Sequence, residues 1–337
     1  MIGARALFIA LAAQIALATP ALAQVEAPDA HNATPATATA TAQETGHGPV
    51  AQGGDAVEGP VDIITPHITD SHIMDVPCWN HGTLMCEVEL PTWKPVMIGG
   101  YALDLSPTKH VVMLLFAAFL CCAVLITAAR AHARHSHAIG RPKGFAAGIE
   151  SMVLYIRQEV AIPNLGHHGE KYAPFILTLF FFIMFANLLG LIPYGSTATG
   201  NISVTATLAI VTFIVVEIAG MRALGAGYLN TVFYWNKDLP LYMRIPLFLI
   251  MTPIEIIGKF TKPFALTIRL FANMTAGHIV VLALIGLIFL FHNPFSVAPF
   301  FMAVLIMILE LFVALLQAFI FSLLAAVFIG QIRESAH

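Results

Sequence analysis

Charged residues are scarce in this chain. Of its 337 residues, 10% are Asp, Glu, Lys or Arg, whereas 58% are hydrophobic. A typical soluble domain carries about 25% charged residues, so a chain this apolar could not cover its surface with polar groups in water. The composition excludes an ordinary soluble domain and indicates that the lipid bilayer is the solvent for most of the chain.

The chain also lacks a basic surplus, because its formal net charge is -3. Binding to nucleic acid through phosphate neutralisation is therefore excluded. There is no Gly-x-x-x-x-Gly-Lys-Ser/Thr motif, so we expect no nucleotide site and predict no cofactor. The 14 histidines include clusters in basic loops; these are more typical of a solvated loop than of a metal site, and no metal site is predicted.

Cysteine is rare as well, with four residues, which is too few for a disulfide scaffold. Cys121 and Cys122 lie in an apolar run, where cysteine usually serves as core packing. Cys78 and Cys86 lie ahead of the apolar segments, and a disulfide between them is possible because we place this region outside the cytoplasm. Their spacing permits that bond without requiring it.

The N-terminal third divides into two parts before the membrane region. Residues 1–23 resemble a secretory signal peptide, since an apolar stretch too short to span a membrane precedes Ala21-Leu22-Ala23. A retained anchor helix is the alternative. Residues 24–104 form an extension outside the cytoplasm that we expect to be largely disordered, because its first part is rich in Ala, Thr, Pro and Gly. Residues 105–337 form the transmembrane domain.

Five apolar segments in this domain are long enough to cross a bilayer. They run from Val111 to Ala129, Pro174 to Ile192, Val204 to Ala219, Phe264 to Phe291 and Phe295 to Ile329. Basic residues gather in alternate loops, which places the N-terminus outside and the C-terminus in the cytoplasm. The fold class predicted is therefore an all-α polytopic membrane protein with five transmembrane helices, the last two forming a long, tilted antiparallel hairpin.

Two further segments are less regular. The segment from Phe145 to Val160 is amphipathic and is predicted to form a helix on the cytoplasmic face of the membrane. Between Pro240 and Pro263, prolines interrupt an apolar stretch that also carries Glu255. We expect a broken or strongly tilted helix there.

Arg269 lies within the fourth apolar segment. An arginine near the middle of a membrane costs about 2.5 to 3.5 kcal/mol on insertion scales, so a compensating interaction is needed. Snorkelling to the interface is the alternative, but Lys262 and Pro263 already occupy the cytoplasmic approach. Asn273, four residues on, shares the face of Arg269. The pattern favours a fixed positive charge that faces water or a partner.

The last two segments place ionisable and polar residues at matching depths. In a hairpin that turns near Asn293-Pro294, His278 and Glu310 average position 294, and Arg269 and Gln317 average position 293. At 1.5 Å per residue the first pair lies roughly 20 to 25 Å from the turn and the second about 35 Å. The sequence therefore predicts a proton-exchanging layer above a permanent cation.

Several motifs together resemble the a subunit of the F-type ATP synthase, over about Leu105 to Gln331. They are Ile268-Arg269-Leu270-Phe271-Ala272-Asn273-Met274, Gln317-Ala318-Phe319-Ile320-Phe321, Asn187-Leu188-Leu189-Gly190-Leu191-Ile192-Pro193, and Glu255 ahead of Lys262-Pro263. In that family the arginine at the position of Arg269 faces a carboxylate of the rotor, and the glutamine at Gln317 supports it. Many members have an acidic residue where Gly190 stands here.

The resemblance implies a non-catalytic, proton-translocating stator subunit in a bacterial inner membrane. Its partners would be the c-ring, the b subunit of the peripheral stalk, the lipid bilayer and protons. One half-channel would be lined by His278, Glu310 and Asn187, and Glu255 would serve the other. An ion-coupled secondary transporter is the alternative function, but such folds usually contain internal repeats, and no second copy of the Arg269 region is found. A membrane cytochrome is disfavoured because His278 stands essentially alone at membrane depth.

Overall fold

The computed structural model describes residues 70–80, 83–93, 96–98, 101–103, 106–135, 144–166, 169–192, 197–228, 233, 240–290 and 296–334. The predicted signal peptide, the first part of the extension and the turn at Asn293-Pro294 lie outside these residues. Five of the described helices are long and apolar enough to cross a membrane. The predicted all-α polytopic fold with five such helices is confirmed.

The last part of the N-terminal extension forms two small antiparallel hairpins. Strand β1 (Ile73–Asn80) pairs with β2 (Thr83–Glu89), and β3 (Val96–Ile98) pairs with β4 (Tyr101–Leu103). The register places Val76 opposite Cys86, so Cys78 lies two residues further along and not directly opposite. The structure describes the backbone of these two cysteines and not their side chains, and the disulfide stays a prediction.

The five long helices are α3 (Lys109–His135), α6 (Ala173–Gly190), α7 (Ile202–Leu224), α9 (Leu241–Leu290) and α10 (Val297–Glu334). Local signals set several of their ends. Pro174 occupies the first turn of α6, where its missing N–H is not needed. Asn201 caps α7, because its side chain accepts a hydrogen bond from the backbone N–H of Ser203 at 2.9 Å.

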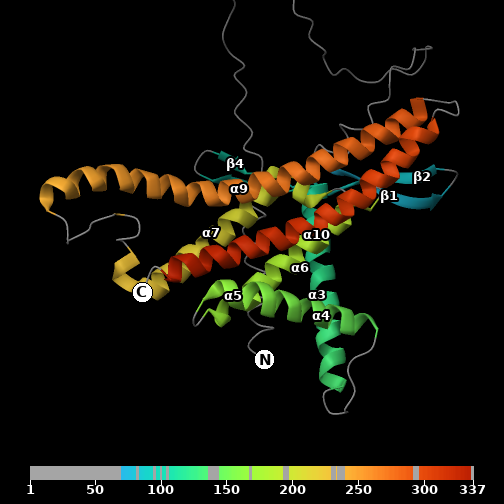
Figure 1. The fold of residues 1–337 in the computed structure, drawn as a ribbon. Coiled ribbons are helices and arrows are strands. Elements are labelled where there is room, and N and C mark those ends of the chain that lie inside the picture. The colour runs from blue at the N-terminus through green and yellow to red at the C-terminus, as the bar shows by residue number, and fades with distance from the viewer. Residues whose placement is uncertain are drawn as a thin grey trace, which may run out of the picture.

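Helix α6 lies at the centre of the bundle. It packs against α3 and α10, and 78% of its membrane span is buried, against 17% for α9 and 28% for α10. Its core includes Leu179, Phe181, Phe182 and Ile183, which are almost inaccessible. Figure 1 shows α9 and α10 as two long helices that converge at one end of the molecule. They therefore keep a broad apolar surface exposed.

Helix α9 is continuous over 50 residues although it contains Pro246, Pro253 and Pro263. The break that we considered over this stretch does not occur within the described helix, which instead arches (Figure 1). Transmembrane helices tolerate proline when neighbouring groups satisfy the freed carbonyls. At 1.5 Å per residue α9 is about 75 Å long, more than twice a hydrocarbon core of about 30 Å, so it cannot stand upright within a membrane.

Shorter helices cover the end of the bundle where α3 finishes. The predicted amphipathic segment forms α4 (Phe145–Tyr155), continued by the π-helical turn η1 (Ile156–Ala161) and by α5 (Ile162–Leu165). Ile156 and Val160 are buried, whereas Arg157 and Glu159 are exposed, as an amphipathic helix requires. The end of α10 docks here, because Arg333 Nη1 donates to the Leu165 carbonyl at 3.0 Å. Three further short helices are η2 (Glu170–Tyr172), η3 (Ala198–Gly200) and η4 (Gly225–Tyr228).

Candidate functional site

Glu310 lies where α10 packs against α9. Its side chain is buried, with 6% exposure, and lies against Gly277. A Cβ atom added at Gly277 would come within 2.9 Å of Glu310 Oε1, so a larger residue there would force the carboxyl group to shift. Glu310 therefore lies at the level of Gly277 and of the half-buried His278, which is the depth that the spacing predicted.

The carboxyl group of Glu310 is poorly satisfied. Its Oε1 atom is buried and has no hydrogen-bond partner within the described residues. A buried polar atom left in this state costs about 1 to 3 kcal/mol, and more when it is charged. Protonation removes the charge, so the site suits a carboxyl group that gains and loses a proton.

Asn187 connects three elements beside this carboxyl group. It is fully buried on α6, and its Nδ2 donates to the Ala314 carbonyl of α10 at 3.1 Å. Its Oδ1 accepts a hydrogen bond from Thr199 of η3 at 2.7 Å. Ala314 is one helical turn from Glu310. Asn187, which was predicted to line one path with Glu310, contacts the adjacent turn of α10.

Gly190 stands where many members of the resembled family carry an acidic residue. The space that a side chain would take is filled by Thr197, which is itself buried and donates from Oγ1 to the Gly190 carbonyl at 3.4 Å. An acidic side chain at this position could be placed only if Thr197 moved. A threonine hydroxyl therefore stands here in place of a carboxylate.

Arg269 lies on the exposed surface of α9 and lines a cavity of about 270 Å³ with Lys262, Leu324 and Phe328. Within the described part of the chain its side chain forms no hydrogen bond or ion pair. Asn273 is exposed one turn further along. Gln317 is buried on α10, with 4% exposure, and no hydrogen bond joins it to Arg269. The helix thus presents an exposed cation that has no partner among the described residues.

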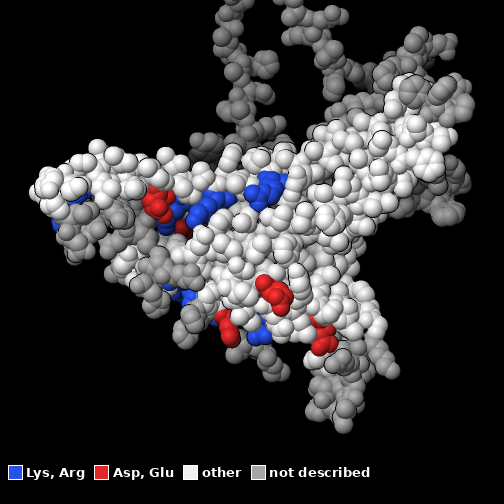
Figure 2. Space-filling view, in the orientation of Figure 1, with Lys and Arg blue, Asp and Glu red and all other residues white. Residues whose placement is uncertain are grey.

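Figure 2 shows Lys and Arg side chains in a short row along α9, with Asp or Glu side chains beside one end of the row, while the surface beyond its other end carries no charge. Exposed residues nearer the start of α10 are large and apolar, among them Ile308, Leu309 and Phe312. A surface of this kind suits lipid or an apolar partner, and a guanidinium within it suits a partner that carries an acid.

A second and larger cavity, of about 420 Å³, lies between α7, α9 and the end of α10. Glu255 lines it and is exposed. Lys259 lines it as well, and its Nζ donates to both carboxylate oxygens of Glu217 at 3.3 Å and to the Tyr228 hydroxyl at 2.6 Å. Glu217 interrupts the third apolar segment, so a search for ionisable residues at membrane depth could have found it. Glu217 is not among the site residues predicted from the sequence.

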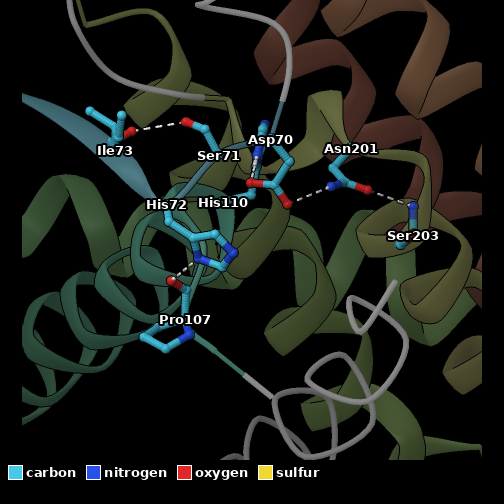
Figure 3. A network of polar contacts seen from close by, with 8 residues as sticks. All are labelled: Asp70, Ser71, His72, Ile73, Pro107, His110, Asn201 and Ser203. Atoms are coloured by element: carbon cyan, nitrogen blue, oxygen red, sulfur yellow. Dashed lines mark hydrogen bonds and ion pairs between the residues drawn. The ribbon is translucent and has the colours of Figure 1, made fainter. Parts of the chain in front are cut away.

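A polar network that the sequence analysis also missed lies at the opposite end of the bundle (Figure 3). Asp70, from the extension, accepts a hydrogen bond from His110 Nδ1 at 2.7 Å and another from Asn201 Nδ2 at 3.4 Å. Burial raises the pKa of Asp70, but the hydrogen bond and charge of His110 outweigh it, so the pKa lies below its ordinary value. The carboxylate therefore joins the starts of α3 and α7.

Comparison with known proteins identifies the family. The family model described as ATP synthase A chain matches residues 111–330. The chain is 46% identical to ATP synthase subunit a 2 of Chlorobaculum tepidum over 87% of this chain and 79% of that protein. It is 41% identical to ATP synthase subunit a of Anaeromyxobacter dehalogenans over 96% of this chain and 87% of that protein. The corresponding protein of Myxococcus xanthus is 44% identical, over 82% and 90% of the two chains. The chain is a multi-pass membrane protein that belongs to the ATP synthase A chain family.

Proposed function

We propose that this protein is the stator subunit that carries protons through the membrane sector of an F-type ATP synthase. The proposal depends most on one observation, the exposed guanidinium of Arg269 on α9 with no partner in the described part of the chain. A guanidinium stays charged at any working pH. Placing this charge within a membrane costs about 2.5 to 3.5 kcal/mol, so an acidic partner is needed to compensate it. A c-ring that turns past α9 would supply such an acid.

Two proton paths reach opposite sides of this arginine. His278 lies nine residues after Arg269 and Glu255 lies fourteen before it, which corresponds to about 14 Å and about 21 Å along the helix. His278, Glu310 and Asn187 line the path from the outer side. Glu255, in the larger cavity, serves the path to the cytoplasm, with Glu217 and Lys259 beside it. Neither path passes the arginine itself.

The transport cycle follows from charge and solvation. A proton from the outer path neutralises a rotor carboxylate, and only the neutral carboxyl can turn into lipid. After nearly a full turn it meets the cytoplasmic path and releases the proton. Arg269 then stabilises the ionised carboxylate, because an adjacent cation lowers a carboxyl pKa by about 1 to 3 units. Since arginine does not give up its own proton, it also blocks a direct leak between the two paths.

The chemistry of ATP synthesis takes place elsewhere in the complex, so this subunit is not itself catalytic. Each proton that crosses a potential of about 100 mV supplies about 2.3 kcal/mol, and several protons per turn drive rotation. The subunit lies in the bacterial inner membrane with its N-terminus outside and its C-terminus in the cytoplasm. The b subunit of the peripheral stalk holds it against the torque of the c-ring.

The test is ATP-driven proton pumping by the whole complex in inverted membrane vesicles. Arg269→Ala abolishes pumping, and Arg269→Lys fails as well, because an ammonium lacks the planar fork and can deprotonate. Arg222→Ala is the matched control, since Arg222 is an exposed cation in the last turn of α7 and does not line the larger cavity. Normal pumping by either Arg269 variant contradicts the proposal.

A further inference from the structure

The hairpin that β3 and β4 form in the N-terminal extension is entirely apolar in sequence. Its two strands read Val96-Met97-Ile98 and Tyr101-Ala102-Leu103. Alternate residues of a strand lie on opposite faces, so a ribbon of this sequence has no polar face. A hairpin with one face in water usually alternates apolar and polar residues. Among the described elements, β3 packs mainly against β4, so the described part of the chain does not supply a cover for both faces.

Two described side chains of this region are large and exposed. Trp93, three residues before β3, is 59% exposed, and Met97 in β3 is 70% exposed. Removing such side chains from water is favourable in proportion to their apolar area. Tryptophan combines an apolar ring system with an N–H donor, and it is enriched where a membrane meets water. The two side chains therefore suit an amphipathic layer better than bulk water.

Hydrogen bonds fix this region at the level where the first membrane span begins. The Trp93 N–H donates to the Ser106 hydroxyl at 2.8 Å, and that hydroxyl donates to the Trp93 carbonyl at 3.4 Å. Ser106 lies three residues before Lys109, the first residue of the span, and three residues reach at most about 11 Å. The Lys109 N–H donates in turn to the Ser71 carbonyl at 3.0 Å. The backbone at Trp93 is therefore close to the membrane boundary.

The backbone of the hairpin decides the depth at which it can lie. Because β3 and β4 form a two-stranded sheet, the outer edge of each strand leaves N–H and carbonyl groups without a partner in the sheet. Such edges are not stable in contact with hydrocarbon, where no water satisfies them. In the headgroup layer these groups stay hydrated, while apolar side chains leave bulk water. The headgroup layer therefore accommodates both the backbone and the side chains of the hairpin.

We propose that the β3–β4 hairpin and Trp93 lie in the headgroup layer beside the start of α3 and anchor the N-terminal extension to the membrane. The partner is a phospholipid surface, and zwitterionic lipid suffices because Trp93 and Met97 are uncharged. Figure 1 shows the strands at the end of α3 that lies away from α4, where the extension meets the bundle. The inference goes beyond the proposed function and does not depend on it, since it requires only the membrane span that begins at Lys109.

The experiment measures the depth of Trp93 by fluorescence quenching in the full-length chain. Trp79→Phe and Trp235→Phe leave Trp93 as the only tryptophan of the three. The purified chain is reconstituted into phosphatidylcholine vesicles whose acyl chains carry bromine either near the headgroup or near the terminal methyl group. We expect Trp93 to lose most of its emission to bromine near the headgroup and little to bromine near the chain end. Iodide in the water should quench it weakly.

The matched control moves the tryptophan to Glu89, an exposed acid on β2 of the same extension. With Glu89→Trp and Trp93→Phe together, we expect strong quenching by iodide and none by brominated lipid. As a second measurement that keeps every tryptophan, Met97→Cys in a background without the native cysteines should react with a water-soluble maleimide more slowly than Glu89→Cys does. Iodide quenching of Trp93 equal to that of position 89 would place the extension in water, and protection from both quenchers would place Trp93 against protein. Either result overturns the inference.

Discussion

Replacing Gly277 by alanine tests whether the position of the Glu310 carboxyl group controls proton transport. The added Cβ atom would lie 2.9 Å from Oε1 and 3.0 Å from Cδ of Glu310, whereas ordinary contacts begin near 3.4 Å. The carboxyl group must therefore retreat by about 0.5 Å. Because a misplacement of about 1 Å can slow a reaction about a hundredfold, we expect pumping to fall about tenfold.

The same substitution favours the helix itself, which separates transport from folding. Alanine is preferred over glycine within a helix by up to about 1 kcal/mol. Gly286→Ala is the matched control on α9, since nothing lies within 4 Å of the added atom. The assay is ATP-driven pumping in inverted vesicles, normalised to the amount of assembled complex. Equal pumping by the Gly277→Ala and Gly286→Ala variants would refute the reasoning.

Three other predictions follow from the contacts described above. The double variant His278→Glu, Glu310→His retains more pumping than either single variant, because a histidine and a carboxyl group still face each other with their positions exchanged. A double variant that pumps no better than the worse single variant contradicts direct coupling between the two residues. Lys259→Ala destabilises the assembled complex by about 1 to 3 kcal/mol in thermal unfolding, and adding Glu217→Gln recovers part of the loss because no unpaired charge is left; a further loss in the double variant contradicts this account. Because the pKa of Asp70 lies below its ordinary 3.8, its stabilisation of the extension is present above that pH and is lost as the pH falls through the lowered value. Protection of the Leu90 and Lys109 amides against hydrogen exchange, corrected for the intrinsic exchange rate at each pH, therefore falls on acidification, and Asp70→Asn removes the dependence.

The membrane helices could be predicted from the sequence because each contains an apolar run that matches the thickness of a bilayer. The continuity of α9 through its prolines could not be predicted, because hydropathy does not show whether neighbouring groups satisfy the backbone carbonyls that a proline leaves free. That Glu310 and His278 lie at the same depth follows from helix geometry alone once a hairpin is assumed. That Gly277 makes room for the carboxyl group depends on side-chain packing across two helices, which no sequence spacing reveals.

The two acidic residues that sequence reasoning did not identify, Glu217 and Asp70, differ in the signal that the sequence carries for them. Glu217 carries the same signal as Arg269, an ionisable side chain in an apolar segment, and it could have been found. Asp70 carries no such signal, because it lies in a polar extension far from its partners in sequence. Only the fold brings it to His110 and Asn201, which are 40 and 131 residues away.

The most direct test of the central claim is a cross-link from position 269 to the rotor. In a background without the native cysteines, Arg269→Cys is combined with a cysteine at the mid-membrane carboxylate of the small two-helix subunit of the ring, and the membranes are oxidised. Leu270→Cys is the control, since Leu270 is the next residue on α9 and only 1% exposed. We predict a disulfide between the two chains from position 269 and none from position 270. No cross-link from position 269, or equal cross-linking from both positions, would contradict the account.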